Sequence, residues 1–125
     1  MNTLKYTKDH EWLLLEDDDT VVIGITDYAQ EQLGEMVFVE LPDVGRDVSQ
    51  GEEAAVVESV KAAGDVKAPV SGTVVEVNDA LVDEPGKVNE DPLGEGWFFK
   101  LKISDPKELD KLLDESDYNS LLEAL

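Results

Sequence analysis

The sequence contains no cysteine and only one histidine, His10. Without cysteine the chain has no disulfide, no thiolate nucleophile and no cysteine-ligated metal. Any sulfur chemistry in which the protein takes part must therefore use sulfur from another molecule. A lone histidine is also a poor catalyst when no nucleophile lies beside it.

Positive charge is scarce as well. Lys and Arg number 10 against 30 Asp and Glu, which gives a formal net charge of -20. Affinity for nucleic acid comes from Lys and Arg that displace counterions, so we expect no nucleic-acid partner. An anionic membrane surface is disfavoured for the same reason. Because 42% of the residues are apolar and are interleaved with the charges, we do not expect a disordered acidic tail.

Long hydrophobic runs are also missing. No apolar stretch approaches the roughly 18 residues that indicate a transmembrane helix, and residues 1–10 lack the apolar segment of a signal peptide. We therefore expect a cytoplasmic protein of bacterial type, or a mitochondrial one whose leader was removed. The length of 125 residues predicts a single domain, with a core over about 5–103 and a helical cover over about 105–124.

Strand patterns dominate the first hundred residues. Residues 12–16 and 20–24 are apolar runs rich in β-formers, separated by Asp17, Asp18 and Asp19, and they predict a hairpin with a charged tip. The three aspartates lack the glycine and the distal glutamate of a calcium loop, so we interpret them as a solvated turn.

One short helix is expected over residues 27–33, with Thr26 as its N-cap and Gly34 as its end. Two segments beyond it share a weak internal repeat, in which valines two residues apart follow a glycine by three positions. The repeat comprises Gly34, Val37 and Val39, and Gly72, Val75 and Val77. This pattern predicts a mainly β protein, a flattened barrel or sandwich of two small antiparallel sheets with peripheral helices.

The C-terminal segment has a helical pattern. Asp105, Pro106 and Glu108 predict a capping box with proline at the first helical position. Ser116 and Asp117 are expected to open a last short helix. Leucines recur at helical spacing at Leu109, Leu112, Leu113, Leu121 and Leu122. We interpret these leucines as a cover for the β core.

The segment between the two β units, residues 54–72, carries the most informative pattern. Small and β-branched residues rise to a tip near Lys61 and descend to a turn at Pro69. Val60 and Ala62 leave the lysine ammonium accessible to a second protein. An ordinary solvated hairpin lysine fits the composition equally well, but the position of Lys61 between two repeated units is typical of the attachment lysine of a swinging-arm carrier.

Motifs in the order of one known family extend over nearly the whole chain, from about residue 5 to the end. They comprise Asp9-His10-Glu11-Trp12, residues 22–30, Leu33-Gly34, residues 39–42, Gly45, residues 58–62, Asp65, residues 69–72, Asn78, Pro85, Asn89, Pro92 and Gly96-Trp97. With these motifs the sequence resembles the H-protein family of the glycine cleavage system, in the lipoyl/biotinyl carrier superfamily. The resemblance implies a hammerhead, lipoyl-domain-like fold.

The resemblance also implies a function. Lys61 is expected to carry lipoic acid as an amide, in a recognition context of Glu58, Ser59, Val60 and Ala62. The resemblance implies a non-enzymatic carrier with three partner enzymes. It would shuttle an aminomethyl group from glycine decarboxylase (P protein) to an aminomethyltransferase (T protein), and dihydrolipoamide dehydrogenase (L protein) would reoxidise its dithiol. A lipoate ligase or an octanoyl/lipoyl transferase would attach the cofactor, and we expect a monomer.

The residues around Lys61 distinguish this family from related carriers. Biotin carriers of the superfamily place the lysine between two methionines, whereas this chain has only Met1 and Met36. Lipoyl domains of 2-oxo-acid dehydrogenases usually have Asp before the lysine, whereas Val60 precedes Lys61 here. The pattern therefore favours a lipoyl carrier of the H-protein form.

Three further residues are candidates for a cleft that holds the arm. The loaded arm carries an ammonium group, which a cleft can shelter from water and hold against a carboxylate. The resemblance assigns acidic residues to this role at Glu11 and Asp65, although with 30 carboxylates both also fit as solvated loop acids. We expect His10 to pack or hydrogen-bond beside Trp12 in the cleft wall.

The sequence departs from the family pattern at Lys67, Leu93 and Gly64, which affects the expected fit to partners more than the identity of the attachment residue. Two alternatives stay open. An H-like carrier that acts in lipoate relay to other complexes would keep Lys61 and the same motifs. An acidic β-fold hydrolase is a remote alternative, for which the sequence offers no signature beyond abundant carboxylates.

Overall fold

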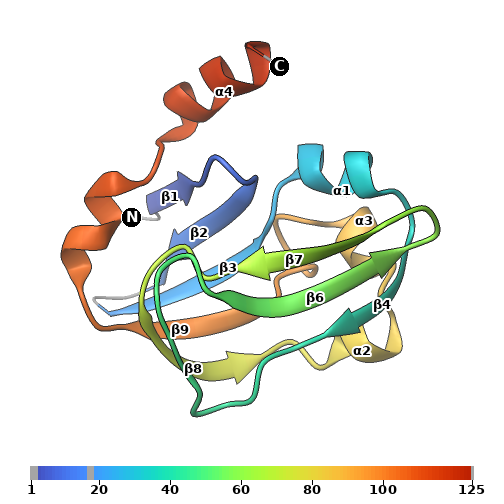
Figure 1. The fold of residues 1–125 in the computed structure, drawn as a ribbon, viewed down its shortest axis with the longest axis horizontal. Helices are drawn as coiled ribbons and strands as arrows, with labels where there is room; N and C mark the ends of the chain where they lie inside the picture. Colours follow the sequence, from blue (N-terminus) through green and yellow to red (C-terminus); the bar gives the residue numbers. More distant parts are fainter. Residues whose placement is uncertain (1–2, 17–18, 125) are drawn as a thin grey trace.

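The computed structural model describes residues 3–16 and 19–124, which form two antiparallel sheets with helices at the periphery (Figure 1). One sheet has six strands in the order β1-β2-β3-β9-β8-β5, and the other has three in the order β4-β6-β7. The strands are β1 (Thr3–Tyr6), β2 (Glu11–Leu15), β3 (Thr20–Ile25), β4 (Met36–Glu40), β5 (Asp47–Val48), β6 (Glu53–Ser59), β7 (Ala63–Lys67), β8 (Gly72–Val77) and β9 (Phe99–Ile103). The predicted mainly β sandwich is confirmed.

The helices are short and lie outside the sheets. They are α1 (Asp27–Leu33), α2 (Ala80–Asp83), α3 (Lys87–Glu90), the 3-10 helix η1 (Pro106–Lys111) and α4 (Glu115–Glu123). The prediction for α1 is confirmed, because the Thr26 hydroxyl accepts a hydrogen bond from the backbone N–H of Ala29 and the helix ends at Gly34. None of the helices within the described ranges has the length and apolar character needed to cross a bilayer.

The hairpin of β2 and β3 is also confirmed, while Asp17 and Asp18 of its expected tip lie outside the described residues. Trp12 pairs with Gly24 across this hairpin. A Cβ atom on Gly24 would lie 2.7 Å from the Trp12 indole, so the glycine provides the space in which the ring packs. The indole N–H donates to the carbonyl of Pro92 at 2.8 Å, which joins the hairpin to the loop before β9.

The expected capping box at the C-terminal segment is wrong in one of its two halves. Asp105 caps η1 as predicted, since its carboxylate accepts from the backbone N–H of Lys107. Glu108, however, does not reach back to the cap but accepts from both the backbone N–H and the hydroxyl of Ser71, at 2.6 and 2.9 Å. The segment forms a 3-10 helix, and this tertiary contact uses the carboxylate that a capping box requires.

The last helix begins one residue earlier than expected. Asp114 is the N-cap of α4, and its carboxylate accepts from the backbone N–H of Asp117. Leu113 precedes the helix and forms an isolated antiparallel bridge with Tyr6. The chain's C-terminal segment is therefore hydrogen-bonded to the end of β1.

Two hydrophobic clusters hold the molecule together. The larger fills the space between the two sheets, and Leu109 and Leu112 pack against its edge. The smaller one is built around Tyr6, Trp12, Val22 and Tyr118, with Leu113, Leu121 and Leu122 packed against it. The C-terminal leucines thus cover the β core as predicted, but they do so on two separate clusters.

Candidate functional site

The turn that carries Lys61 is braced by one side chain. Strands β6 and β7 pair antiparallel, and the predicted hairpin between them is present. At its tip the hydroxyl of Ser59 accepts from the backbone N–H groups of Lys61 and Ala62, at 3.3 and 3.0 Å, and donates to the carbonyl of Ala62 at 3.0 Å. This hydroxyl satisfies backbone groups that an exposed turn would otherwise leave to solvent, and it fixes the direction in which Lys61 projects.

The tip is also attached to the rest of the fold. The backbone N–H of Val60 donates to the carbonyl of Glu35 at 3.0 Å. The stem of Lys61 lies over Gly34, where an added Cβ would be 2.9 Å from Cε of the lysine. Gly34 has a φ of 89°, a conformation that glycine adopts at little cost. The stem of Lys61 therefore packs on the C-terminal end of α1, while the Lys61 residue as a whole stays exposed.

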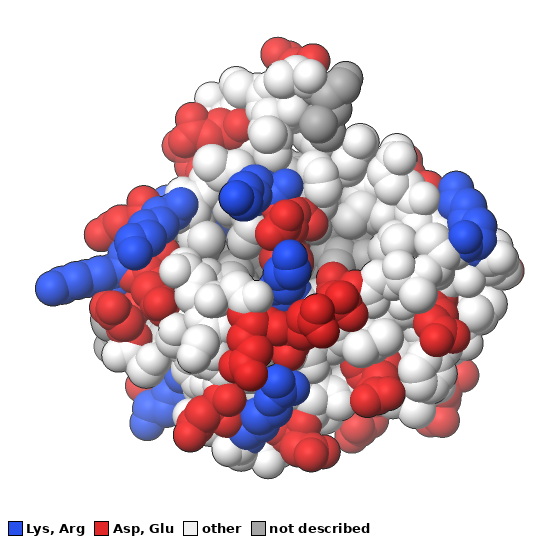
Figure 2. Space-filling view, in the orientation of Figure 1, with Lys and Arg blue, Asp and Glu red and all other residues white. Residues whose placement is uncertain are grey.

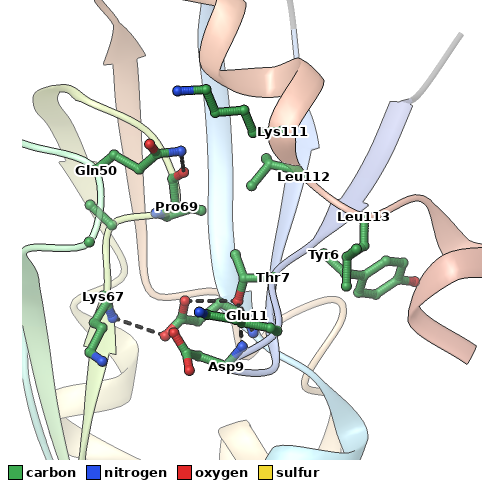
Figure 3. A pocket seen from close by; sticks show the side chains of 13 residues that line it. Tyr6, Thr7, Asp9, Glu11, Gln50, Lys67, Pro69, Lys111, Leu112 and Leu113 are labelled. Carbon is green, nitrogen blue, oxygen red and sulfur yellow. Dashed lines mark hydrogen bonds between the residues drawn. The ribbon is translucent and has the colours of Figure 1, made fainter. Parts of the chain in front are cut away.

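A cleft of about 450 Å³ lies at the other end of β7. Four segments line it: the end of β1 with the turn to β2, residues 50–51, the end of β7 with the residues up to Pro69, and residues 111–113 (Figure 3). Apolar atoms of Tyr6, Leu112 and Leu113 form part of the lining. Because β7 runs from the Lys61 tip to Lys67 in the cleft wall, one strand connects the two places.

Glu11 is the buried acid of this cleft, with 3% of its surface exposed. Its carboxylate accepts from the hydroxyl of Thr7 at 3.0 Å and from the backbone N–H of Lys67 at 3.1 Å, as the dashed lines in Figure 3 show. Burial raises the pKa of Glu11 to about 7, because it disfavours the charged form, and Asp9 raises it further. The two hydrogen bonds and the charge of Lys67 lower the pKa only in part. Glu11 therefore titrates near neutrality, which is common at functional sites.

The structure places the other two predicted cleft residues differently. Asp65 is exposed on β7 opposite Val56, between the Lys61 tip and the cleft, and it is not part of the cleft lining. It shares the face of β7 that also carries Lys67, because side chains of a strand alternate between faces.

His10 belongs to an aromatic cluster beside the C-terminal helix. Its Nδ1 is 2.8 Å from the hydroxyl of Tyr118, which is itself 2.7 Å from the hydroxyl of Thr26. The imidazole also packs on Tyr28, with the ring centroids 4.5 Å apart. Burial lowers the pKa of His10, and the charge of Asp9 opposes this shift. His10 is absent from the cleft lining, but it has a φ of 69° in the turn that presents Glu11.

Two residues of the site, Thr7 and Tyr118, were not predicted from the sequence. Thr7 accepts from the backbone N–H groups of Asp9 and Glu11 as well as donating to the Glu11 carboxylate, so it organises the whole turn. A threonine two residues before an aspartate is a known turn signal and could have indicated this role. No local signal could have indicated Tyr118, which lies 108 positions from His10.

The three departures from the family pattern have different surroundings. Lys67 lines the cleft. Leu93 is about half exposed and lies beside Tyr28 and Tyr118. A Cβ on Gly64 would be 3.5 Å from Leu33 and 3.7 Å from Val57, which are ordinary contacts. Of the three, only Lys67 brings a charge into the candidate site.

Known proteins share both the sequence and the fold of this chain. Residues 4–125 match the family described as Glycine cleavage H-protein. The chain belongs to that family. A glycine cleavage system H protein of Rhodospirillum rubrum is 57% identical over 122 residues, which cover 98% of this chain and 97% of the relative. One of Escherichia coli O7:K1 is 60% identical over 120 residues, which cover 96% and 93%.

A solved structure of the H-protein family supports the same assignment. The crystal structure of a glycine cleavage system H protein from Mycobacterium marinum is similar to this chain with a TM-score of 0.87 and 41% sequence identity, and covers 98% of both chains. Proteins of the H-protein family are the lipoyl carriers of the glycine cleavage system, and this chain is one of them. By its family it is a carrier and not a catalyst.

The residues present fit a covalent lipoyl group. An acyl amide on a lysine needs an accessible amine on a stem that neighbouring side chains do not cover. Lys61, Ala62 and Ala63 are all exposed at the tip, and Val60 exposes 64% of its surface beside them. Figure 2 shows acidic side chains in several groups on the face that carries β6 and β7, with basic side chains and large uncharged areas between them.

Proposed function

We propose that Lys61 carries the lipoyl group of this carrier, in amide linkage to its ε-amine. The observation that carries the proposal is the exposed amine of Lys61 on a turn that is fixed by Ser59 and by the Glu35 carbonyl. When bound, the lipoyl group supplies the dithiolane sulfur that the cysteine-free chain lacks, and it carries the aminomethyl unit. The chain's own residues hold the attachment point and orient it.

Four enzymes are proposed to contact the tip. Glycine decarboxylase, aminomethyltransferase and dihydrolipoamide dehydrogenase would each receive the arm, and a lipoate ligase or an octanoyl/lipoyl transferase would read Glu58, Ser59, Val60 and Ala62 before it acylates Lys61. The formal net charge of -20 favours enzymes with basic patches at their active-site mouths. Since the relatives named above are bacterial, we infer that these encounters take place in a bacterial cytoplasm.

The Glu11 cleft is proposed to receive the ammonium end of the arm. Glu11 accepts only from a hydroxyl and a backbone N–H, and its carboxylate makes no ion pair with any side chain in the described part of the chain. A cation that enters the cleft would therefore add a charge-assisted hydrogen bond to a carboxylate already shielded from water. Asp65 lies on the path along β7, and His10 supports the turn that presents Glu11.

The attachment is tested by mass. Expression with a lipoate ligase is expected to raise the intact mass by one lipoyl group, and Lys61→Arg is expected to abolish the increase because the guanidinium is not acylated. Lys67→Arg is the matched control, since it removes the other lysine of the hairpin and should keep the full increase. Modification of the Lys61→Arg protein, or its loss in Lys67→Arg, would contradict the proposal.

A further inference from the structure

Basic side chains are concentrated at the cleft of this acidic protein. The whole chain has 10 Lys and Arg, and three of them, Lys8, Lys67 and Lys111, line this one cavity. In the described part of the chain, ion pairs engage Arg46, Lys87 and Lys100 but none of the three cleft lysines. The cleft thus contains cations that are not held by a carboxylate.

Lys67 is the cleft lysine with a direct connection to Glu11. Its backbone N–H donates to the Glu11 carboxylate at 3.1 Å, which places the start of its side chain beside that group. Figure 3 shows the side chains of Lys67 and Asp9 on either side of the Glu11 carboxylate, while Lys111 lies at the far end of the cleft. The positive charge of Lys67 also lowers the pKa of Glu11, so the two groups interact electrostatically.

We propose that the Lys67 ammonium is a built-in competitor of the cationic arm end for the carboxylates of Glu11 and Asp9. The inference rests on the proposed function, in which the ammonium end of the arm enters this cleft. Lys67 is thereby a positioning residue that weakens retention of a cationic arm end and favours its release to the next enzyme.

The physical reason is repulsion between like charges that share one largely buried carboxylate. When the cleft holds no other cation, the ammonium of Lys67 reduces the negative potential of Glu11 and Asp9. An arm that brings a second ammonium must share these carboxylates with Lys67 or displace it. Lys67 is only partly buried and has a flexible stem, so it can move toward solvent. Displacement lowers the docking constant without closing the cleft.

The absence of cysteine permits a direct test. Lys61→Cys introduces the only thiol of the chain, which can be alkylated with a stable arm of lipoyl-lysine length that ends in a primary ammonium. An arm of equal length that ends in a hydroxyl is the neutral reference. The fraction docked is read from the NMR shifts of the backbone amide at position 67 and the side-chain carbonyl carbon at position 11, because the two groups are joined by a hydrogen bond. This measurement needs no enzyme and no lipoate.

Lys67→Gln removes the charge and keeps the backbone N–H that Glu11 accepts. We expect the docking constant of the ammonium arm to rise on the order of threefold, as for other partly exposed charge pairs, and that of the hydroxyl arm to stay constant. Lys102→Gln makes the same change of net charge at an exposed site on β9 and should leave docking unchanged. Lys67→Arg should restore weak docking, because it restores the charge.

Unchanged or weaker docking of the ammonium arm in Lys67→Gln would overturn the inference, and so would an equal gain in Lys102→Gln. Glu11→Gln separates this failure from failure of the proposed function. If the ammonium arm docks no better than the hydroxyl arm in the unsubstituted cleft, or if Glu11→Gln leaves its advantage intact, then the cleft does not hold the cation through Glu11. As a second readout without any arm, Lys67→Gln should raise the pKa of Glu11, whereas Lys102→Gln should not.

Discussion

The turn that carries Lys61 is held mainly by the Ser59 hydroxyl, with one further backbone hydrogen bond to Glu35, whereas the Glu11 cleft needs segments from distant parts of the chain. At the tip, one hydroxyl satisfies the backbone and the amine points into solvent. At the cleft, a carboxylate is buried between the β1–β2 turn and the end of β7. The two regions therefore differ in role: the tip exposes its lysine and is supported by nearby contacts to Gly34 and Glu35, while the cleft buries a carboxylate between segments that are distant in sequence.

The largest expected effect is a pH dependence of stability that arises from Glu11 in the cleft and not from the Lys61 tip. The pKa of Glu11 is about 7 in the folded protein against an ordinary value of 4.5, so the folded state binds this proton more tightly than the unfolded state. The contribution to stability is present below about pH 4.5 and is lost as the pH rises through 7. The shift corresponds to about 3 kcal/mol.

Glu11→Gln should remove this pH dependence, because glutamine keeps the shape without ionising. Its amide oxygen can still accept from the backbone N–H of Lys67, while its NH2 group can only donate toward the Thr7 hydroxyl. Relative to the wild-type chain, its free energy of unfolding should therefore rise between pH 5 and pH 8 in urea titrations. Lys61→Gln at the exposed tip serves as the control and should shift stability equally at both pH values. A constant difference between Glu11→Gln and wild type would contradict the raised pKa.

The next largest effect is expected at Gly34, on which the stem of Lys61 packs. Gly34→Ala should destabilise the fold by about 1–2 kcal/mol because of its left-handed φ, and it should also displace the lysine stem. Gly45→Ala and Gly51→Ala are matched controls, since both glycines have similar positive φ values and open space around the added Cβ. Melting curves report the shared strain, and lipoylation rates should change only in Gly34→Ala. Equal lipoylation rates in all three variants would show that the contact between Gly34 and the Lys61 stem does not affect lipoylation.

A smaller effect is expected from the cluster behind the cleft. Tyr118→Phe removes the hydroxyl that joins His10 to Thr26 and should cost about 1 kcal/mol. Because His10 lies in the turn that presents Glu11, amide exchange should also accelerate at Thr7 and Glu11. Tyr28→Phe keeps the ring that packs on His10 and is the control. If exchange in the β1–β2 turn stays unchanged in Tyr118→Phe, then the cluster does not support the cleft.

The smallest effect is expected at the tip itself. Ser59→Ala should cost about 0.5–1 kcal/mol, since the freed backbone groups at this exposed turn can bond to water. Amide exchange should increase at Lys61 and Ala62 and stay unchanged in the cleft. Exchange that spreads to the Lys67 amide would show that the two ends of β7 are coupled.

The Lys61 tip and the Glu11 cleft also differ in how far they could be predicted from the sequence. The Lys61 hairpin and α1 were predictable because caps, turn residues and strand formers act over a few positions. The role of Glu108 was not, because its bonds to Ser71 reach 37 positions back along the chain. Nor could the sequence indicate that the backbone of Lys67 would meet Glu11, since that contact depends on how one sheet packs on the other. The sequence also could not indicate that His10 and Asp65 lie outside the cleft lining, because their positions depend on the same tertiary packing.

The bridge between Tyr6 and Leu113 has a consequence for the order of events during synthesis. Every residue of the β6–β7 hairpin is synthesised before residues 111–113, which form one wall of the cleft. During synthesis the complete Lys61 turn therefore exists before the cleft is complete. The Lys61 turn therefore does not require the C-terminal segment, whereas any role of the cleft requires residues 111–113 to be in place.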